Sequence, residues 1–407
     1  MVLGRYKGVE LVGTSPSAEP TLGNRTLSAV EGPFGSAQGE LRTGPEPRSQ
    51  MTRGRVAVAM SGGVDSSVAA ALLVEQGYDV IGVMMRLWSE DGQAEGVRDR
   101  SYLPAATEDA RRVSHSLGIP FYVLDYEAPF RERVVEYFLT EYTHGRTPNP
   151  CLACNRYIKF GLLLEQALAL NADYLATGHY ARVRSADNEY QLWRGVDRAK
   201  DQSYFLYMLG QEQLRHLLMP LGDYRKEQVR SMARERNLPV RDKAESQDLC
   251  FIADGDYHRF LRQRVPEAVV PGPIVDTSGK VLGEHHGLAF YTIGQRKGLG
   301  ISAAAPLYVL HLDVERSTLV VGTSAELGRR SLVASNVTFV SGRYPDAALR
   351  VSAKIRYRAR MRKAMVIPLP GKQIEVTFER PLRDIAPGQA VVFYQGEVVL
   401  GGGIIGE

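Results

Sequence analysis

Between residues 55 and 177 the sequence alternates short apolar runs, typical of strands, with longer segments of helical periodicity. The strand-like runs are residues 55–60, 79–85, 121–125 and 174–177, and the helical segments are residues 66–76, 105–117, 129–142 and 158–170. Strands separated by helices of this length predict parallel βαβ units with right-handed crossovers. A sheet of this kind binds ligands at the carboxyl ends of its strands.

The remainder of the chain has a different pattern. Residues 211–270 are mostly helical in periodicity, and after residue 271 short runs alternate polar and apolar positions, with turns between them. We therefore expect a Rossmann-like α/β domain at 51–210, a helical segment at 211–270, a small, mostly β central domain at 271–328 and a C-terminal β-barrel at 329–407. Residues 1–50, rich in Gly, Ser and Pro, are expected to be a disordered extension or to precede a mis-assigned start at Met51.

Composition limits the class of protein. No apolar run approaches the ~18 residues that a membrane span needs. The N-terminus lacks a signal-peptide pattern, and three cysteines in 407 residues form no disulfide framework. We expect a cytoplasmic protein without a membrane partner. Residues 331–407 hold eleven Lys and Arg but six Asp and Glu, which predicts a surface for a polyanion.

The strongest local motif is Ser-Gly-Gly-Val-Asp-Ser-Ser at residues 61–67, between the first strand and the first helix. Glycines allow an anion to approach the backbone, and a helix start offers N–H groups and the positive end of a dipole. No Gly-Lys-Ser/Thr follows, so this is not a Walker A loop. The motif resembles the pyrophosphate loop of the ATP pyrophosphatases, a resemblance that implies adenylation rather than kinase chemistry.

The three cysteines allow several interpretations. Cys151 and Cys154 form a CxxC before a predicted helix, whose dipole, with Lys159, is expected to stabilise a thiolate. Cys250 lies almost a hundred residues away. The thiols could be inert core residues, carriers of sulfur, or three ligands of a [4Fe–4S] cluster with one open iron.

Residues 354–362 alternate strictly between cations and other side chains. As one strand, this segment would place five cations on one face, which we interpret as a phosphate-binding face rather than a charged edge strand. The polar segments at residues 177–182 and 200–204 have the character of site loops, although His179 alone would more often be a structural histidine.

The ordered motifs SGGVDSS, GRTPNPCLACNRYIKFG, ATGHYARV, KDQSYFLY, CFIADGDYHRFL, YTIGQRKGLGI, KIRYR, PGQAVVFY and GGGII resemble the bacterial tRNA-uridine 2-sulfurtransferases from about residue 55 to residue 406. The resemblance implies ATP-dependent 2-thiolation of the wobble uridine of tRNA, with Lys, Glu and Gln tRNAs as the expected substrates. The uridine would be activated as an adenylate, and a cysteine desulfurase or a sulfur-relay protein would supply the sulfur.

The resemblance also implies roles for individual residues. ATP, with Mg²⁺, would be held by Ala59, Met60, Ser61, Gly62, Gly63, Val64, Asp65, Ser66, Met85 and Gly178. Cys250 would carry a persulfide, and Cys154 would be the second catalytic thiol. The tRNA would contact Asn149, Pro150, Cys151, His179, Lys200, Asp201, Gln202, Arg356, Tyr357 and Gln389.

One position departs from the pattern of many relatives, which have Asp where this chain has Cys151. A neutral thiol cannot replace the carboxylate charge, and Cys151 completes a possible cluster-binding set with Cys154 and Cys250. The persulfide route is our first hypothesis, and an iron–sulfur-dependent thiolation is the alternative. A ligase or amidotransferase acting on a small molecule would explain the loop but not the thiols, and an RNA-binding protein without activity would explain neither.

Overall fold

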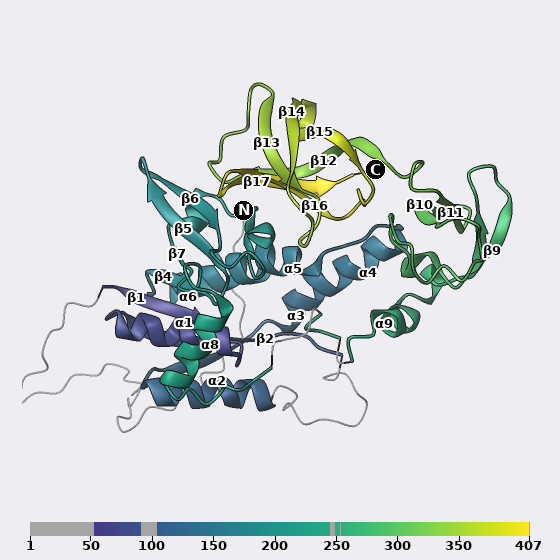
Figure 1. Ribbon diagram of the computed structural model, residues 1–407. Helices are drawn as coiled ribbons and strands as arrows, with labels where there is room; N and C mark the ends of the chain where they lie inside the picture. The colour runs from purple at the N-terminus through teal and green to yellow at the C-terminus, as the bar shows by residue number, and fades with distance from the viewer. Residues whose placement is uncertain (1–52, 91–103, 245–248, 253, 407) are drawn as a thin grey trace, which may run out of the picture.

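The computed structural model describes residues 53–90, 104–244, 249–252 and 254–406, and the expected extension at 1–50 lies outside this part of the chain. Figure 1 shows the α/β domain at one end of an elongated molecule, the central domain at the other end and the barrel above them. Among the described residues, no helix has the length and apolar character needed to cross a membrane.

The predicted α/β domain is confirmed as a five-stranded, all-parallel sheet with the order β3-β2-β1-β4-β7. Its strands are β1 (Arg55–Ala59), β2 (Asp79–Arg86), β3 (Phe121–Asp125), β4 (Tyr174–Ala176) and β7 (Leu217–Leu218). Three helices, α1 (Val64–Glu75), α2 (Pro104–Leu117) and α8 (Lys226–Glu235), accompany the sheet. The sheet continues past residue 210, so the boundary expected there does not coincide with a break in the fold.

Two long helical stretches precede β4. The first consists of α3 (Glu127–Phe130), a π-helical turn (Arg131–Val135) and α4 (Glu136–Thr143), and the second of α5 (Pro150–Ala153), a π-helix (Cys154–Leu163) and α6 (Leu164–Ala169). The second stretch begins eight residues before the expected start at residue 158, because Pro150 at the first position presets a helical φ. Cys151 and Cys154 therefore lie within the helix rather than ahead of it.

The barrel has its own sheet, which a hairpin from the α/β domain extends by two strands. Its strands are β12 (Arg329–Phe339), β13 (Leu349–Lys354), β14 (Arg362–Leu369), β15 (Gln373–Leu382), β16 (Ala390–Gln395) and β17 (Val398–Ile405). Pairing of β12 with β17 closes the barrel around an apolar core. The hairpin of β5 (Ala181–Ala186) and β6 (Glu189–Arg194), which follows β4, extends this sheet through pairing of β6 with β17.

The central domain is mostly β, as predicted. Its sheet has the order β10-β11-β8-β9, with strands β8 (Gly272–Val275), β9 (Val281–His285), β10 (Tyr308–Asp313) and β11 (Thr318–Gly322). β11 and β8 pair in parallel, whereas β10–β11 and β8–β9 are antiparallel. The remaining helices are α7 (Gln211–Leu214) and α9 (Tyr257–Arg264), with 3-10 turns at Ser203–Leu206, Pro266–Ala268, Leu288–Phe290 and Pro370–Lys372.

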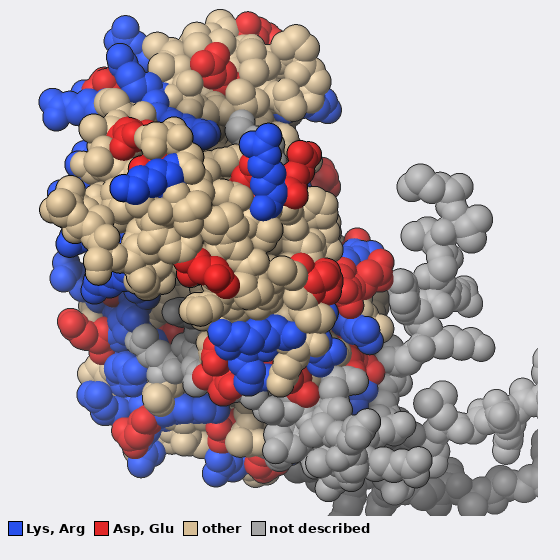
Figure 2. Space-filling view, turned by 90° about the vertical axis from the view of Figure 1, so that its right-hand side faces the viewer, with Lys and Arg blue, Asp and Glu red and all other residues tan. Residues whose placement is uncertain are grey.

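The prediction of one cationic strand at residues 354–362 is wrong. β13 ends at Lys354 and β14 begins at Arg362, so the segment between them is a turn, with Lys354 and Ile355 buried. Neighbouring residues of a strand point to opposite faces, but Lys354 and Ile355 are both buried. The cations of this segment therefore do not share one face. Figure 2 shows Lys and Arg gathered along one edge of the molecule, with uncharged residues over the middle of that view.

Candidate functional site

The phosphate loop, residues 61–66, connects the carboxyl end of β1 to α1. Ser66 closes the loop on itself: its hydroxyl accepts a hydrogen bond from the Ser61 backbone N–H at 3.1 Å and lies 3.2 Å from the Ser61 hydroxyl. The helix begins at Val64, two residues before the expected position, with Gly63 as an N-cap that supplies no side-chain cap. The loop therefore brings hydroxyl groups and a helix start together, which is the arrangement that binds phosphate.

Two glycines make this loop possible. Gly62 has a φ of +67°, a conformation that other residues seldom adopt, and a Cβ there would lie 2.2 Å from the carbonyl oxygen of Ala106. A Cβ on Gly178 would lie 2.9 Å from the Ser66 backbone nitrogen and 3.0 Å from the carbonyl carbon of Asp65. The loop after β4 thus lies directly against the start of α1, as expected if Gly178 takes part in an ATP site.

The other residues expected at ATP occupy the neighbouring strand ends. Ala59 is the last residue of β1, and Met60 follows it as a buried side chain. Met85 lies next to the end of β2, which is hydrogen-bonded beside β1. These positions are compatible with an adenosine pocket beside the phosphate loop.

Lys226 and Tyr180 hold the acidic residue of the phosphate loop. The Lys226 ammonium donates to both carboxylate oxygens of Asp65, at 2.7 Å each, and the Tyr180 hydroxyl donates to Asp65 Oδ1 at 2.8 Å. Lys226 is the first residue of α8, 161 positions further along the chain. No sequence motif indicates this contact, because a single lysine in a helical segment forms no pattern.

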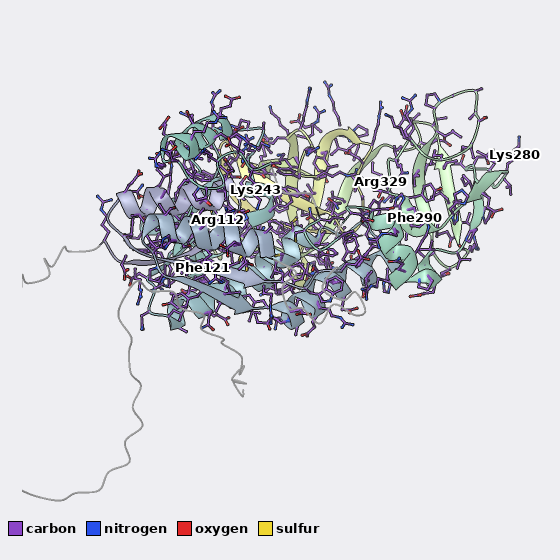
Figure 3. All side chains as sticks on the ribbon, turned by 90° about the horizontal axis from the view of Figure 1, so that it is seen from below. Arg112, Phe121, Lys243, Lys280, Phe290 and Arg329 are labelled. Atoms are coloured by element: carbon purple, nitrogen blue, oxygen red, sulfur yellow. The ribbon has the colours of Figure 1, made fainter. Side chains whose placement is uncertain are left out.

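A second lysine, Lys243, approaches the loop from the same part of the sequence. Its ammonium donates to the Gly62 carbonyl at 2.9 Å and to Asp109 Oδ2 on α2 at 2.7 Å. Burial acts to raise the pKa of Asp109, but hydrogen bonds from Lys243 and Arg112 outweigh it, so the pKa lies below its usual value. Lys243 and Arg112 lie on the α/β domain, whereas Lys280 lies at the far end of the molecule (Figure 3). Two cations missed by sequence reasoning thus stand at the phosphate loop.

The thiol region consists of Cys151, Cys154, Cys250 and Lys159. Cys151 is exposed on the first turn of α5, and Cys154 is buried at the start of the π-helix. Burial raises the pKa of Cys154, and the nearby Lys159 cation lowers it by less. The expected stabilisation of a Cys154 thiolate is therefore wrong for this conformation, because loss of solvation outweighs the favourable charge.

Cys250 has an exposed surface, yet protein atoms surround its sulfur closely enough to raise its pKa to about 12. Cys154 and Cys151 also raise this pKa, and the Lys159 cation lowers it. The fold thus brings Cys250 near the CxxC. Among the described residues, however, no three His, Cys, Asp or Glu side chains are placed to hold a metal ion. The thiols do not fit a cluster in this arrangement, and we derive no step through one.

His179 connects the two regions. It is buried, its Nδ1 lies 2.8 Å from the Thr177 hydroxyl, and its ring lies 5.6 Å from the ring of Phe160 on the cysteine-bearing helix. Burial, assisted by Lys159, lowers its pKa well below 6.5, so the imidazole is neutral at pH 7. One short loop therefore touches the phosphate loop through Gly178 and the cysteine-bearing helix through His179.

The predicted RNA-contacting segment 200–202 is anchored to the protein. Asp201 is buried, accepts from Arg194 Nε at 2.8 Å and from two backbone N–H groups. Gln202 Oε1 accepts from the Tyr180 backbone N–H at 3.0 Å. Lys200 is partly exposed at the beginning of this segment. The structure therefore gives Asp201 and Gln202 internal partners, which sequence reasoning did not anticipate.

The residues expected to touch RNA from the barrel lie at contacts between domains: Gln389 and Tyr357 meet the α/β domain, and Arg356 meets the central domain. Gln389 Nε2 donates to the Thr147 carbonyl at 2.9 Å, two residues before Asn149 and Pro150. A cavity of about 390 Å³ opens at this junction of three domains, lined by Thr147, Thr292, Gly294, Gln295, Arg356 and Gln389. Arg356 brings a cation to the cavity wall, where its Nη2 donates to the Ile293 carbonyl at 2.9 Å and its Nε lies 4.0 Å from an Asp384 carboxylate oxygen.

Tyr357 lies at the same junction. Its ring centroid is 4.5 Å from that of Phe205 and 6.3 Å from that of Tyr204, and Lys354 stands 5.9 Å from its face. These contacts come from both sides of the interface between the barrel and the α/β domain. The junction thus packs Tyr357 against the core of the α/β domain, and Tyr204 and Lys354 are buried there.

Comparison with known proteins gives matches over nearly all of the described chain. Residues 54–254 match the family described as tRNA methyl transferase HUP domain, residues 258–323 the tRNA methyl transferase PRC-barrel domain, and residues 329–405 the aminomethyltransferase beta-barrel domain. The chain is similar to proteins named tRNA-specific 2-thiouridylase MnmA. That of Carboxydothermus hydrogenoformans is 50% identical over 359 residues, 87% of this chain and 98% of the relative. That of Moorella thermoacetica is 53% identical over 352 residues, 86% of this chain and 98% of the relative.

Proposed function

Because the chain belongs to the family of the tRNA-specific 2-thiouridylases, we propose that it replaces the C2 oxygen of the wobble uridine of tRNA with sulfur in an ATP-dependent reaction. The observation that supports this most strongly is the loop at residues 177–179, which joins the phosphate loop to the cysteine-bearing helix. Nucleotide activation and sulfur chemistry would then take place on opposite sides of a single short segment.

The phosphate loop supplies the first step. ATP would lie against residues 59–66, with Met85 and Gly178 at the adenosine, and would arrive with its Mg²⁺. The uridine C2 oxygen attacks the α phosphorus, pyrophosphate leaves, and the uridine becomes an adenylate. Lys226 and Lys243 stand where they can offset the charge of the departing pyrophosphate.

The thiol region supplies the second step. A cysteine desulfurase or a relay protein would load a persulfide on Cys250. The Cys154 thiolate attacks the Cys250 sulfur, forms a disulfide and releases the outer sulfur as hydrosulfide, which adds to C2 as AMP leaves with the oxygen. An external thiol then reduces the disulfide. Because burial raises the pKa of both thiols, their ionisation requires a change in surroundings when tRNA or the donor binds.

The tRNA would approach along the junction of the three domains, near Asn149, Cys151, Arg356 and Gln389. Residues 200–202, with their internal partners, would support this surface rather than form most of it. Lys, Glu and Gln tRNAs are the proposed substrates, and a tRNA substrate agrees with the cytoplasmic location expected from the sequence.

The test is an anaerobic incubation of the purified protein with ATP, Mg²⁺, a sulfide source and an unmodified Lys-type tRNA transcript. Digestion of the RNA and mass measurement of the wobble nucleoside should show one sulfur in place of oxygen, with a matching amount of AMP. AMP without thiouridine would contradict the sulfur route. Pyrophosphate release without RNA would favour a small-molecule ligase instead.

A further inference from the structure

Two hairpins meet edge to edge where the barrel joins the α/β domain. The β5–β6 hairpin belongs in sequence to the α/β domain, and β17 belongs to the barrel. They pair at Val398 with Trp193 and at Val399 with Leu192, and the Arg194 N–H donates to the Glu397 carbonyl at 2.9 Å. Glu397 occupies the two-residue turn between β16 and β17, so it stands at the tip that enters the α/β domain.

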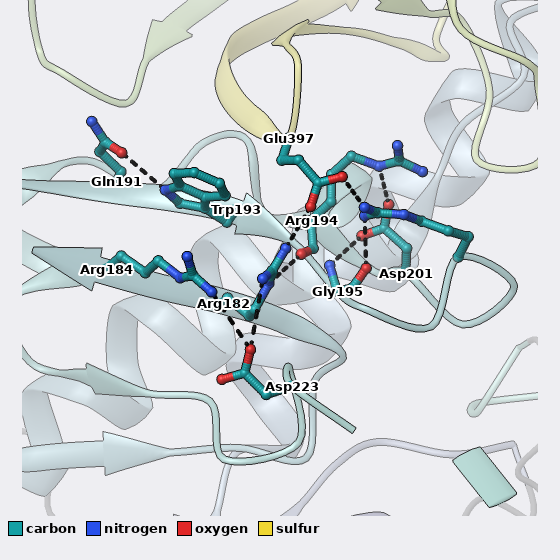
Figure 4. Close-up of polar contacts among 10 residues, drawn as sticks. Arg182, Arg184, Gln191, Trp193, Arg194, Gly195, Asp201, Asp223 and Glu397 are labelled. Carbon is teal, nitrogen blue, oxygen red and sulfur yellow. Dashed lines mark hydrogen bonds and ion pairs between the residues drawn. The ribbon is translucent and has the colours of Figure 1, made fainter. Parts of the chain in front are cut away.

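The Glu397 carboxylate is the centre of an ion network at this contact (Figure 4). Arg182 Nη2 donates to Glu397 Oε2 at 2.8 Å, and Arg198 Nη2 donates to Oε1. Arg182 is only 8% exposed, and its Nε donates to the Arg194 carbonyl at 2.7 Å. Asp223 lies 3.6 Å from Arg182. Removal of the Glu397 charge would leave Arg182 with Asp223 as its ion-pair partner and would remove the carboxylate that Arg182 and Arg198 share.

The same segment continues to the phosphate loop. Arg194 binds buried Asp201, and the next residue, Gln202, exchanges hydrogen bonds with the backbone of Tyr180. The Tyr180 hydroxyl donates to Asp65 in the phosphate loop at 2.8 Å. A continuous set of polar contacts therefore runs from the tip of the barrel hairpin to the ATP loop.

We propose that Glu397 is a positioning residue that fixes the barrel on the α/β domain and so sets the separation between RNA held at the domain junction and the phosphate loop. This inference rests on the proposed function for its RNA partner. The junction cavity has walls from both sides, because Thr147 comes from the α/β domain and Arg356 and Gln389 from the barrel. A shift of the barrel relative to the α/β domain would change the separation between bound RNA and the phosphate loop. A misplaced substrate reacts slowly.

The chain offers a matched control in Glu189. Its carboxylate also joins the β5–β6 hairpin to the barrel, by a hydrogen bond of 3.0 Å from Arg343 Nη2, but at the opposite end of the hairpin. Arg343 is 72% exposed, and exposed ion pairs contribute little. The two carboxylates are similarly exposed, at 41% for Glu397 and 36% for Glu189, so Glu397→Gln and Glu189→Gln remove the same charge from the same interface and differ in the arginine partner, which is buried for Glu397 and exposed for Glu189.

The experiment compares these two variants with the unaltered chain in three measurements: amide hydrogen exchange along β6 and β17, tRNA-dependent thiolation, and binding of a non-hydrolysable ATP analogue. Glu397→Gln should speed exchange at Leu192 and Val399 and lower kcat/KM for tRNA about tenfold, whereas the Kd for the analogue stays within about twofold. Glu189→Gln should match the unaltered chain, and Glu397→Asp should restore part of kcat/KM.

The outcomes separate this inference from the proposed function. Glu397 does not position the barrel if amide exchange in Glu397→Gln equals that in Glu189→Gln. The same holds if its affinity for the ATP analogue and its kcat/KM for tRNA fall in equal proportion. If exchange rises but tRNA turnover is unchanged, the contact is structural only and the inference is overturned. If the unaltered chain makes no thiouridine, the proposed function fails, and the exchange data still report whether Glu397 holds β17 against β6.

Discussion

The phosphate loop and the thiol region lie on opposite sides of the segment Thr177–His179 but provide contrasting environments. The phosphate loop is polar, with serine hydroxyls bonded to one another and lysines from distant segments against Asp65 and the Gly62 carbonyl. In the thiol region Cys151 is exposed, but burial raises the pKa of Cys154 and Cys250. The first region is arranged for charge before any ligand binds, and the second keeps its reactive groups neutral.

This difference has a chemical consequence. A neutral thiol is a weak nucleophile, so the sulfur step cannot proceed fast in the described conformation. Adenylation needs no ionisation of a buried group, because its cations are already in place. In the proposed reaction the uridine of bound tRNA would therefore be adenylated first, and sulfur transfer would await the ionisation of a thiol.

The largest expected effect is a loss of sulfur transfer without a loss of ATP cleavage. With a cysteine desulfurase as the sulfur donor, Cys250→Ser should reduce thiouridine formation by at least on the order of 10³, as loss of a catalytic group does, while pyrophosphate is still released from ATP in the presence of tRNA. RNA digestion with mass measurement, alongside measurement of pyrophosphate, checks both. Cys151→Ser is the comparison, and the persulfide route predicts a much smaller loss there, because Cys151 would contact tRNA without carrying sulfur. Equal loss in Cys151→Ser would favour three thiolates on an iron–sulfur cluster.

The next effect concerns the charge of the phosphate loop. Lys243→Met removes two hydrogen bonds from a partly exposed lysine, and a net loss of about 1.5–3 kcal/mol should lower AMP formation roughly tenfold to a hundredfold. Lys280→Met, at the far end of the molecule, should have no effect. The rate at which the thiols react with iodoacetamide should be unchanged in both variants. A changed thiol reactivity in Lys243→Met would show that the two regions are not independent.

A smaller effect is expected where the regions meet. Gly178→Ala places a methyl group 2.9 Å from the Ser66 nitrogen, and overpacking of this kind costs about 1–3 kcal/mol. Affinity for a non-hydrolysable ATP analogue, measured by calorimetry, should fall about tenfold. Gly210→Ala is the control, because its Cβ would meet nothing closer than 3.5 Å. Unchanged affinity would exclude close packing of this loop on the ATP site.

The smallest effect is a pH dependence of stability. Because burial and Lys159 lower the pKa of His179 in the folded state, the unfolded chain binds a proton below about pH 6.5 that the folded chain does not. The free energy of unfolding should therefore fall as pH decreases below about 6.5, by at most ~1.4 kcal/mol per pH unit from this group. Urea unfolding at several pH values should show this slope, and His179→Gln should reduce it.

The order of the domains could be read from the sequence because it depends on periodicity, a local property. Alternating strands and helices predicted the parallel sheet, and the change to a period of two predicted the β domains. The phosphate loop was found for the same reason, since its serines and glycines are neighbours in the chain. The cationic strand at 354–362 was wrong because a local pattern cannot show that Lys354 and Ile355 turn inward.

The sequence by itself determined which groups are available: a phosphate loop, a CxxC, a distant cysteine and a basic C-terminal domain. Tertiary structure alone decided which of them meet and in what charge state. Lys226 and Lys243 reach the loop across 161 and 181 positions, and Glu397 reaches Arg182 across 215. Such contacts leave no periodic trace in the sequence, and solvation of a thiol depends on every atom around it rather than on its neighbours in the chain.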